Sequence, residues 1–126
     1  MNHKLKSYIL LTRLNRPIGS LLLMFPCLWG LIAACNSVLD IKQNIFLFII
    51  FIIGSFVMRS AGCVINDIFD RDIDIKVERT RFRPLANKSL PLHDAIIIFI
   101  ALSLIGLCIL LSLNFLSIKI GFISFL

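Results

Sequence analysis

Four of the chain's seven acidic residues lie in one short stretch, NDIFDRDID, which runs from Asn66 to Asp74. At about 100° per residue, Asp67, Asp70 and Asp74 share one face of a helix within roughly 60°, and Asn66 lies near the edge of that face. Asp72 points almost the opposite way and is left out of this cluster. Three carboxylates and an amide on one face predict an oxygen-ligand site, which suits Mg²⁺ bound together with substrate phosphates.

Two other interpretations of the acidic stretch compete with a metal site. The D-x-D-x-D spacing from Asp70 is also found in calcium loops, but such loops need Gly at the sixth position and Glu at the twelfth. This chain has Ile75 and Arg81 there, which excludes a calcium loop. A solvated acidic face at the end of a helix is the second alternative, and it is less favoured because of the residues that precede the stretch.

Arg59 lies inside the apolar run before the acidic stretch, seven and eight residues ahead of Asn66 and Asp67. Helical spacing places it about 20° from Asn66, on the acidic face. Several carboxylates at the mouth of an apolar segment are costly unless a cationic group lies among them. An ionisable residue within a membrane helix indicates a functional site. Snorkelling to the interface is the weaker alternative, because the water-side end is more than a turn away.

The basic residues are concentrated in two places. Six of the thirteen Lys and Arg residues lie between Arg71 and Lys88, and four precede the first apolar run. Arg79, Arg81 and Arg83 alternate along the loop, and beside a carboxylate–metal site such arginines suit phosphate oxygens. The alternative is the charge bias of cytoplasmic loops alone.

Composition points to a membrane protein. The chain has 126 residues and is 59% hydrophobic, well above the roughly 45–50% of soluble domains. Because the basic residues flank apolar runs, and no helix-turn-helix, zinc-finger or aromatic stacking motif occurs, the net charge of +6 does not indicate nucleic-acid binding. The cysteines form no CxxC pair, and we expect them to be small buried apolar residues: Cys27, Cys35, Cys63 and Cys108.

Apolar runs predict three membrane-spanning helices, at about Ile18–Cys35, Ile45–Ile65 and Ala95–Leu113. We expect the second helix to continue through the acidic stretch. Asp94 is expected to cap the third helix. A short interfacial helix is expected before Pro17, which suits the start of a helix.

The ends of the chain and its loops complete this prediction. The nine residues after Ser117 are too few to span a bilayer, so we expect a fourth helix that is cut short. The positions of Lys and Arg predict a cytoplasmic N-terminus and acidic loop, with the Asn36–Asn44 loop outside.

The stretch AGCVINDIFDRDIDIKVERTRFRPL resembles the UbiA family of intramembrane prenyltransferases, which carries NDxxDxxxD followed by a basic RT…RPL segment. The matching residues are Asn66, Asp67, Asp70, Asp74, Arg79, Thr80, Arg83, Pro84 and Leu85. The segment RLNRPIGSLLLMFPCLWGL, from Arg13 to Leu31, is also similar, most closely to the branch that prenylates 4-hydroxybenzoate. The resemblance covers nearly the whole chain.

The resemblance implies an all-α, polytopic helical bundle in the membrane. Residues 1–126 would form the N-terminal portion of a single domain of this type, truncated to about three transmembrane helices plus a stub. The implied activity is Mg²⁺-dependent transfer of a polyprenyl group from polyprenyl diphosphate to an aromatic acid. The expected acceptor is 4-hydroxybenzoate, in ubiquinone biosynthesis, and the expected location is the inner membrane of a bacterium.

The resemblance also implies roles for particular residues. Asp67, Asp70 and Asp74, with Asn66, would hold Mg²⁺ and the diphosphate. Arg79 and Arg83 would hold or cover the diphosphate. Arg59 would brace the acidic face or meet the carboxylate of the acceptor, and Arg16 would face the same cavity.

Two alternatives of other classes stay open. The family has a second aspartate-rich motif on a later helix, and no acidic residue follows Asp94. The chain could therefore be an inactive remnant, or a membrane subunit that needs a partner chain carrying the missing helices. A small transporter or cation channel with an acidic mouth is the other alternative, but it does not explain the RTxxRPL segment.

Overall fold

The computed structural model describes residues 3–35, 42 and 44–124, and every regular element within those ranges is a helix. The all-α prediction is therefore confirmed for the described part of the chain. Most of the expected Asn36–Asn44 loop lies outside the described residues.

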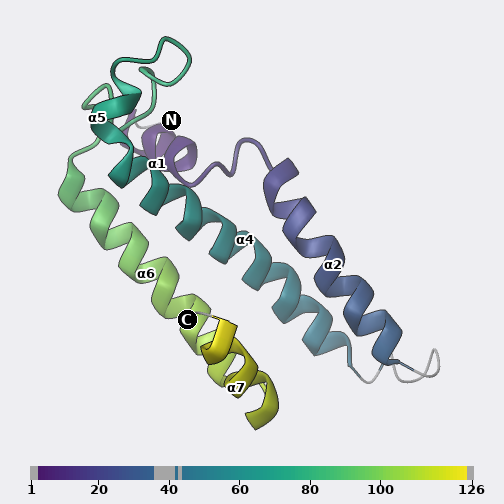
Figure 1. The fold of residues 1–126 in the computed structure, drawn as a ribbon. Helices are drawn as coiled ribbons and strands as arrows, with labels where there is room; N and C mark the ends of the chain where they lie inside the picture. The colour runs from purple at the N-terminus through teal and green to yellow at the C-terminus, as the bar shows by residue number, and fades with distance from the viewer. Residues whose placement is uncertain (1–2, 36–41, 43, 125–126) are drawn as a thin grey trace.

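Three long helices form the body of the molecule: α2 (Ile18–Ala34), α4 (Ile45–Phe69) and α6 (Leu92–Leu111). Helix α4 lies between the other two and packs against both of them (Figure 1). Helix α7 (Phe115–Ser124) folds back beside the C-terminal end of α6, and α1 (His3–Leu11) lies at the opposite end of the bundle (Figure 1). The three predicted apolar helices correspond to α2, α4 and α6, of which α4 and α6 are long enough to cross a membrane and α2, with 17 residues, is shorter.

The outer surface of this bundle is apolar. Helices α4 and α6 are long and apolar enough to cross a membrane. Yet only 28% of the most apolar 18-residue stretch of α4, and 11% of that of α6, is buried. The core helix of a soluble protein would be mostly buried. Large side chains such as Leu22, Trp29 and Leu104 are instead more than half exposed. The bundle is therefore built for a lipid surrounding, in which outward-facing apolar side chains carry no penalty.

Small residues let the three helices approach one another closely. A Cβ atom added to Gly106 of α6 would lie 2.5 Å from the Sδ atom of Met58 in α4. Ser55, Ser60 and Ala61 of α4 are buried, and the Ser55 hydroxyl donates to the carbonyl oxygen of Phe51. Small side chains at helix contacts are typical of membrane proteins, where van der Waals packing drives association.

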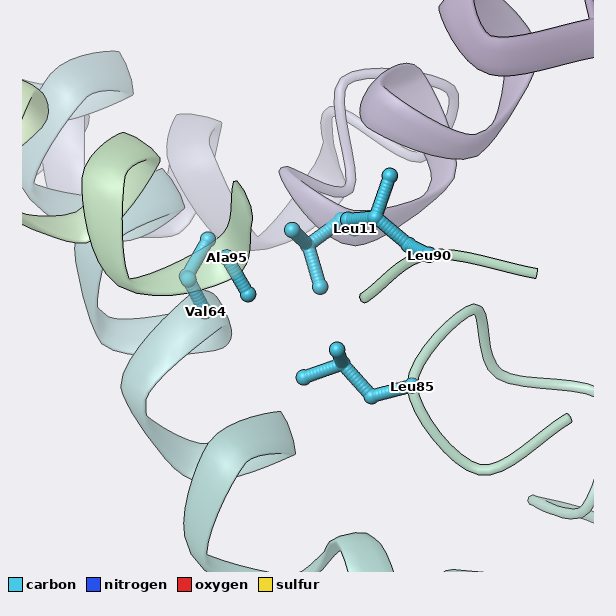
Figure 2. Packing of buried hydrophobic residues seen from close by; sticks show 5 residues of the cluster. All are labelled: Leu11, Val64, Leu85, Leu90 and Ala95. Atoms are coloured by element: carbon cyan, nitrogen blue, oxygen red, sulfur yellow. The ribbon is translucent and has the colours of Figure 1, made fainter. Parts of the chain in front are cut away.

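A small hydrophobic core fastens the polar loop, residues 75–91 between α5 and α6, to one end of the bundle. Figure 2 shows its five buried residues, which come from α1, α4, α6 and the loop: Leu11, Val64, Leu85, Leu90 and Ala95. Beside this core, the Tyr8 hydroxyl donates a hydrogen bond of 3.1 Å to Oδ2 of Asp94. Since α6 already begins at Leu92, after Pro91, the prediction that Asp94 caps this helix is wrong. Its carboxylate instead ties α6 to α1.

The acidic stretch is not one continuous helix, contrary to the sequence prediction. Helix α4 ends at Phe69, and the single turn α5 (Arg71–Asp74) follows. Asp70 between them keeps a helix-like backbone, with φ −83° and ψ −2°, and its N–H donates to the carbonyl oxygen of Asn66 at 2.8 Å. Aspartate has a low helix propensity, and three of the five residues from Asp70 to Asp74 are aspartates. The helical register of the carboxylates is nearly preserved.

Candidate active site

A buried carboxylate lies at the centre of the polar end of the bundle. Asp67 is only 2% exposed, and two arginines approach its Oδ1 atom. Nη2 of Arg13 and Nη1 of Arg83 each lie 3.1 Å from it. Nη1 of Arg83 also donates to Oδ2 of Asp74 at 2.7 Å. Asp67 and Asp74 therefore share one guanidinium, as expected for carboxylates seven residues apart on one helical face.

Arg13 reaches this site from the turn that joins α1 to α2. Its backbone has φ 58°, in the left-handed region that a side chain other than glycine rarely adopts. The turn is held in place because Leu11 is fully buried and the N–H of Arg16 donates to the carbonyl oxygen of Arg13 at 2.9 Å. Sequence reasoning did not select Arg13 as a site residue. The only available signal was its position in the RLNRPIG segment, since helical periodicity does not extend across a turn.

Arg83 is held over the acidic residues by the loop that follows α5. The next two residues, Pro84 and Leu85, are buried, and Leu85 belongs to the hydrophobic core. The Thr80 hydroxyl donates to the carbonyl oxygen of Asp74 at 3.2 Å, which closes the loop against α5. The RTxxRPL segment thus carries both the arginine and the residues that fix its position.

A cavity of about 370 Å³ opens beside Asp67, and we call it the acidic cavity. Its lining includes six charged side chains and one amide: Arg13, Arg16, Arg59, Asn66, Asp67, Asp70 and Arg83. Of the predicted site residues, Asp74 and Arg79 are absent from the lining. Asp74 is buried against Arg83, whereas Arg79 is exposed on the loop.

Arg59 lies in the acidic cavity as the helical spacing predicts, and it packs against α2. A Cβ atom added to Gly19 would lie 2.6 Å from Nε of Arg59 and 2.9 Å from its Nη2. The absence of a side chain at Gly19 therefore makes room for the guanidinium. Among the described residues Arg59 has no ion-pair partner, so its charge is available to the cavity.

A second cavity of about 360 Å³, which we call the arginine cavity, lies between the α1–α2 turn and the polar loop. Four arginines line it: Arg13, Arg16, Arg79 and Arg83. No acidic residue is present among the lining residues. Arg13, Arg16 and Arg83 line both cavities.

In the part of the chain that the structure describes, the acidic cavity does not by itself supply a complete set of side-chain ligands for a divalent metal. No group of three or more His, Cys, Asp or Glu side chains is close enough to hold a metal within the described ranges. The acidic cavity does bring together the carboxylates of Asp67 and Asp70 and the amide of Asn66. Mg²⁺ is usually bound by one or two carboxylates plus substrate phosphates, so these residues fit a metal that arrives with a phosphorylated substrate.

These features define a helical membrane protein with a charged cavity at one end of the bundle. The model of the UbiA prenyltransferase family matches residues 23–126, and the chain belongs to this family. Prenyltransferases of the UbiA family generally use a divalent metal.

Relatives with curated names are similar over almost the whole chain. The 4-hydroxybenzoate octaprenyltransferase of Shewanella piezotolerans is 44% identical over 124 residues, which cover 98% of this chain and 42% of that protein. The protein of the same name from Vibrio atlanticus is 45% identical over 121 residues, covering 96% of this chain and 41% of the relative. The chain therefore spans less than half the length of these relatives. No solved structure matches it.

Proposed function

We propose that this chain provides the diphosphate-binding half of an aromatic prenyltransferase site, which transfers a polyprenyl group from polyprenyl diphosphate to 4-hydroxybenzoate in ubiquinone biosynthesis. The observation that carries the proposal is the buried Asp67 between Arg13 and Arg83, at the polar end of an apolar helix. The names of the Shewanella and Vibrio relatives support the choice of substrates.

The diphosphate would occupy the acidic cavity. Asn66, Asp67 and Asp70 would hold Mg²⁺ there, and the ion, when bound, would supply positive charge against the departing diphosphate. Asp74 would act through Arg83, because its carboxylate accepts a hydrogen bond from Nη1 of Arg83. This assignment keeps all four residues of the NDxxDxxxD motif but gives Asp74 a positioning role.

Arginines would share the remaining negative charge. Arg13 and Arg83 already lie within hydrogen-bond distance of carboxylate oxygens, so a diphosphate oxygen in the cavity would be a similar partner for them. Nε of Arg13 is buried and has no hydrogen-bond partner among the described residues. Preorganised donors of this kind stabilise charge that develops on a leaving group. Arg59 would meet the carboxylate of the aromatic acid, and Arg16 would support the diphosphate from the same cavity.

The polyprenyl chain needs an apolar path next to this site. A cavity of about 230 Å³ lies between α2, α4 and α6, and its lining is almost entirely apolar. It includes Leu23, Ile50, Phe51, Ile109 and Leu110. A chain held there would keep water away from the allylic carbon, where positive charge develops as the C–O bond breaks. The activated ring of 4-hydroxybenzoate would then attack this carbon as the diphosphate leaves, and the ring carbon would pass its proton to the departing diphosphate.

We also propose a location and a topology. Helix α1 and the polar loop meet at one end of the bundle, where Leu11 and Leu85 pack in one core (Figure 2). Both basic segments thus lie at the same end, which favours a cytoplasmic location for the N-terminus and the acidic loop. The bacterial relatives favour the inner membrane.

Helices beyond the region that matches the relatives would complete the site. One acidic face contacts a diphosphate from one side only, and the relatives are more than twice as long as the matched region. These helices would come from the same polypeptide or from a partner chain.

A chimera tests the proposed function independently of length. In the Shewanella piezotolerans relative, this chain replaces the matching segment, and membranes from a bacterium lacking its own 4-hydroxybenzoate prenyltransferase are assayed for prenylated 4-hydroxybenzoate. We expect activity that Asp67→Asn reduces about 10²–10³-fold. A chimera that accumulates in the membrane and melts like the parent protein, yet forms no product, would contradict the proposal.

A further inference from the structure

A further cavity, of about 560 Å³, lies between α5, the end of the polar loop and the start of α6, and we call it the α6 cavity. It shares no lining residue with the acidic cavity or the arginine cavity. Its charged lining residues are Arg71, Asp72 and Lys88, and the rest of the lining is apolar and includes Ile75 and Leu92. A lining that combines charged groups with aliphatic side chains fits an amphiphile, because a free phosphate would gain nothing from the apolar part.

The α6 cavity lies at the depth where α6 enters the membrane. Helix α6 has 20 residues and is therefore about 30 Å long, which equals the thickness of the hydrocarbon layer. Its first turn, which includes Leu92, lies at the boundary between the hydrocarbon and the headgroups. Lys88 precedes Leu92 by four residues and lies on the water side of this boundary. A phospholipid headgroup at this depth can reach Lys88 while its acyl chains lie beside the apolar lining.

The charge of Lys88 is not offset within the cavity. Nε and Nη2 of Arg71 donate to the two carboxylate oxygens of Asp72, at 3.0 and 3.4 Å, so these two charges largely cancel. Lys88 has no ion-pair partner among the residues that the structure describes. The same holds for Lys76 in the same loop, but Lys76 does not line the cavity. Two cations and one anion leave a net positive charge in the lining, which attracts an anionic headgroup.

The backbone at Lys88 is held in a conformation that is unusual for lysine. Its φ of 59° lies in the left-handed region. The turn is fixed because the N–H of Lys88 donates to the carbonyl oxygen of Leu85 at 3.4 Å, and the N–H of Leu90 donates to that of Pro84 at 3.1 Å. Leu85 and Leu90 also belong to the buried hydrophobic core. Strained backbone that the surrounding structure enforces is concentrated at ligand sites, so this turn is a second observation in favour of a ligand at Lys88.

We propose that the α6 cavity binds an anionic phospholipid, with its phosphate on Lys88 and its acyl chains against the apolar lining. The lipid would bridge α5, the polar loop and α6, and would hold the loop at the membrane surface. The ammonium group of phosphatidylethanolamine finds no free carboxylate in the cavity, because Asp72 is already paired with Arg71. The site is independent of the proposed prenyl transfer, since none of its residues lines the acidic cavity.

Lipid retention by the whole chain tests the proposal without requiring turnover. The chain in detergent is mixed with phosphatidylglycerol, phosphatidylethanolamine or phosphatidylcholine of the same acyl chains, and bound lipid is measured by native mass spectrometry. We expect phosphatidylglycerol to bind about fivefold more tightly than the other two, the effect of one cation beside a phosphate. Lys88→Asn should remove this preference, because it removes the charge while asparagine tolerates the left-handed backbone. The matched control is Lys76→Asn, which alters another exposed, unpaired lysine and should change the affinity less than about twofold.

Thermal unfolding separates the lipid contact from backbone strain. Without lipid, Lys88→Asn should melt at the temperature of the parent chain or above it, since asparagine adopts the left-handed region more readily than lysine. Phosphatidylglycerol should raise the melting temperature of the parent chain and of Lys76→Asn, but not that of Lys88→Asn.

Three results would overturn the proposal: equal retention of the three lipids by the parent chain, a preference for phosphatidylethanolamine, or equal loss of phosphatidylglycerol binding in Lys88→Asn and Lys76→Asn. None of them would bear on prenyl transfer, which the chimera measures separately.

Discussion

Nη2 of Arg13 lies 3.1 Å from Oδ1 of Asp67, so a residue of the α1–α2 turn neutralises a buried carboxylate that is 54 positions away in the chain. This contact joins the two segments that resemble the prenyltransferase family. It also places a guanidinium on the wall of both polar cavities. The contribution of this contact to the free energy of unfolding can be measured without any substrate.

Arg13→Ala should lower the free energy of unfolding by about 1–3 kcal/mol, because Asp67 stays buried and keeps only Arg83 as a partner. The loss is smaller than for a fully buried pair, since Arg13 is about one-third exposed. Denaturant unfolding in one detergent provides the measurement. Arg81→Ala, which breaks an exposed pair with Glu78, is the control and should cost less than about 1 kcal/mol. Equal losses of unfolding free energy in the two variants would contradict a specific stabilising role for the contact between Arg13 and Asp67.

The carboxylates of the acidic stretch should not be equivalent in the active chimera. Asp67→Asn and Asp70→Asn should each reduce kcat/KM by about 10²–10³, in line with the loss of one preorganised group that stabilises developing charge. Asp74→Asn should also reduce it, through Arg83. Asp72→Asn should have little effect, because Asp72 is exposed and pairs with the adjacent Arg71 at 3.0 Å. Similar losses for Asp72→Asn and Asp70→Asn would contradict the placement of these side chains.

Gly19→Ala should displace Arg59, since the added Cβ atom would lie 2.6 Å from Nε. If Arg59 binds the carboxylate of the acceptor, the chimera with Gly19→Ala should show a higher KM for 4-hydroxybenzoate and a nearly unchanged KM for the diphosphate. Gly30→Ala is the matched control in the same helix, because nothing lies within 4 Å of its added Cβ atom. A further test is the double variant with Arg59→Ala, in which Gly19→Ala should have no additional effect on this KM. An additive effect would mean that Gly19 acts independently of Arg59.

Tyr8 is the only tyrosine of the chain, so its titration can be followed by ultraviolet absorbance. Its hydrogen bond to Asp94 raises the pKa of the phenol above 10.0, with smaller contributions from burial and from the negative charge of Asp94. The folded state therefore holds this proton more tightly than the unfolded state. The resulting stabilisation is present below pH 10 and is lost as the pH rises through the higher pKa of the folded state. Asp94→Ala should lower the titration midpoint; an unchanged midpoint would show that the bond is not formed in solution.

Cysteine labelling can test the proposed topology. In a variant without the four native cysteines, a cysteine at position 81 should react only with reagent on the cytoplasmic side of the membrane. A cysteine at position 40 should react only from the outer side. Labelling of position 40 from the cytoplasm alone would contradict the topology and the use of Lys and Arg positions to derive it.

Much of the fold followed from local patterns in the sequence. The lengths of the apolar runs predicted α2, α4 and α6, because a membrane helix must satisfy its own backbone hydrogen bonds over the thickness of the bilayer. The spacing of the acidic residues placed Asp67 and Asp74 on one face, and both contact Arg83. The same arithmetic brought Arg59 to the cavity, since it lies on the same helix as Asp67. Periodicity is reliable within one helix because 3.6 residues per turn fixes the relative direction of every side chain.

Only the tertiary structure decided which arginines meet the carboxylates. Arg13 comes from a turn with a left-handed backbone. Arg79 lies only four residues before Arg83, yet it lines the arginine cavity and not the acidic cavity, which most of the predicted site residues line. Pro84 and Leu85 are buried, and the Thr80 hydroxyl donates to the carbonyl oxygen of Asp74. These contacts hold the loop that carries both arginines. These contacts connect segments that no helical repeat relates. Their geometry is determined by packing between the turn, the loop and the end of α4, which spacing along the chain does not encode.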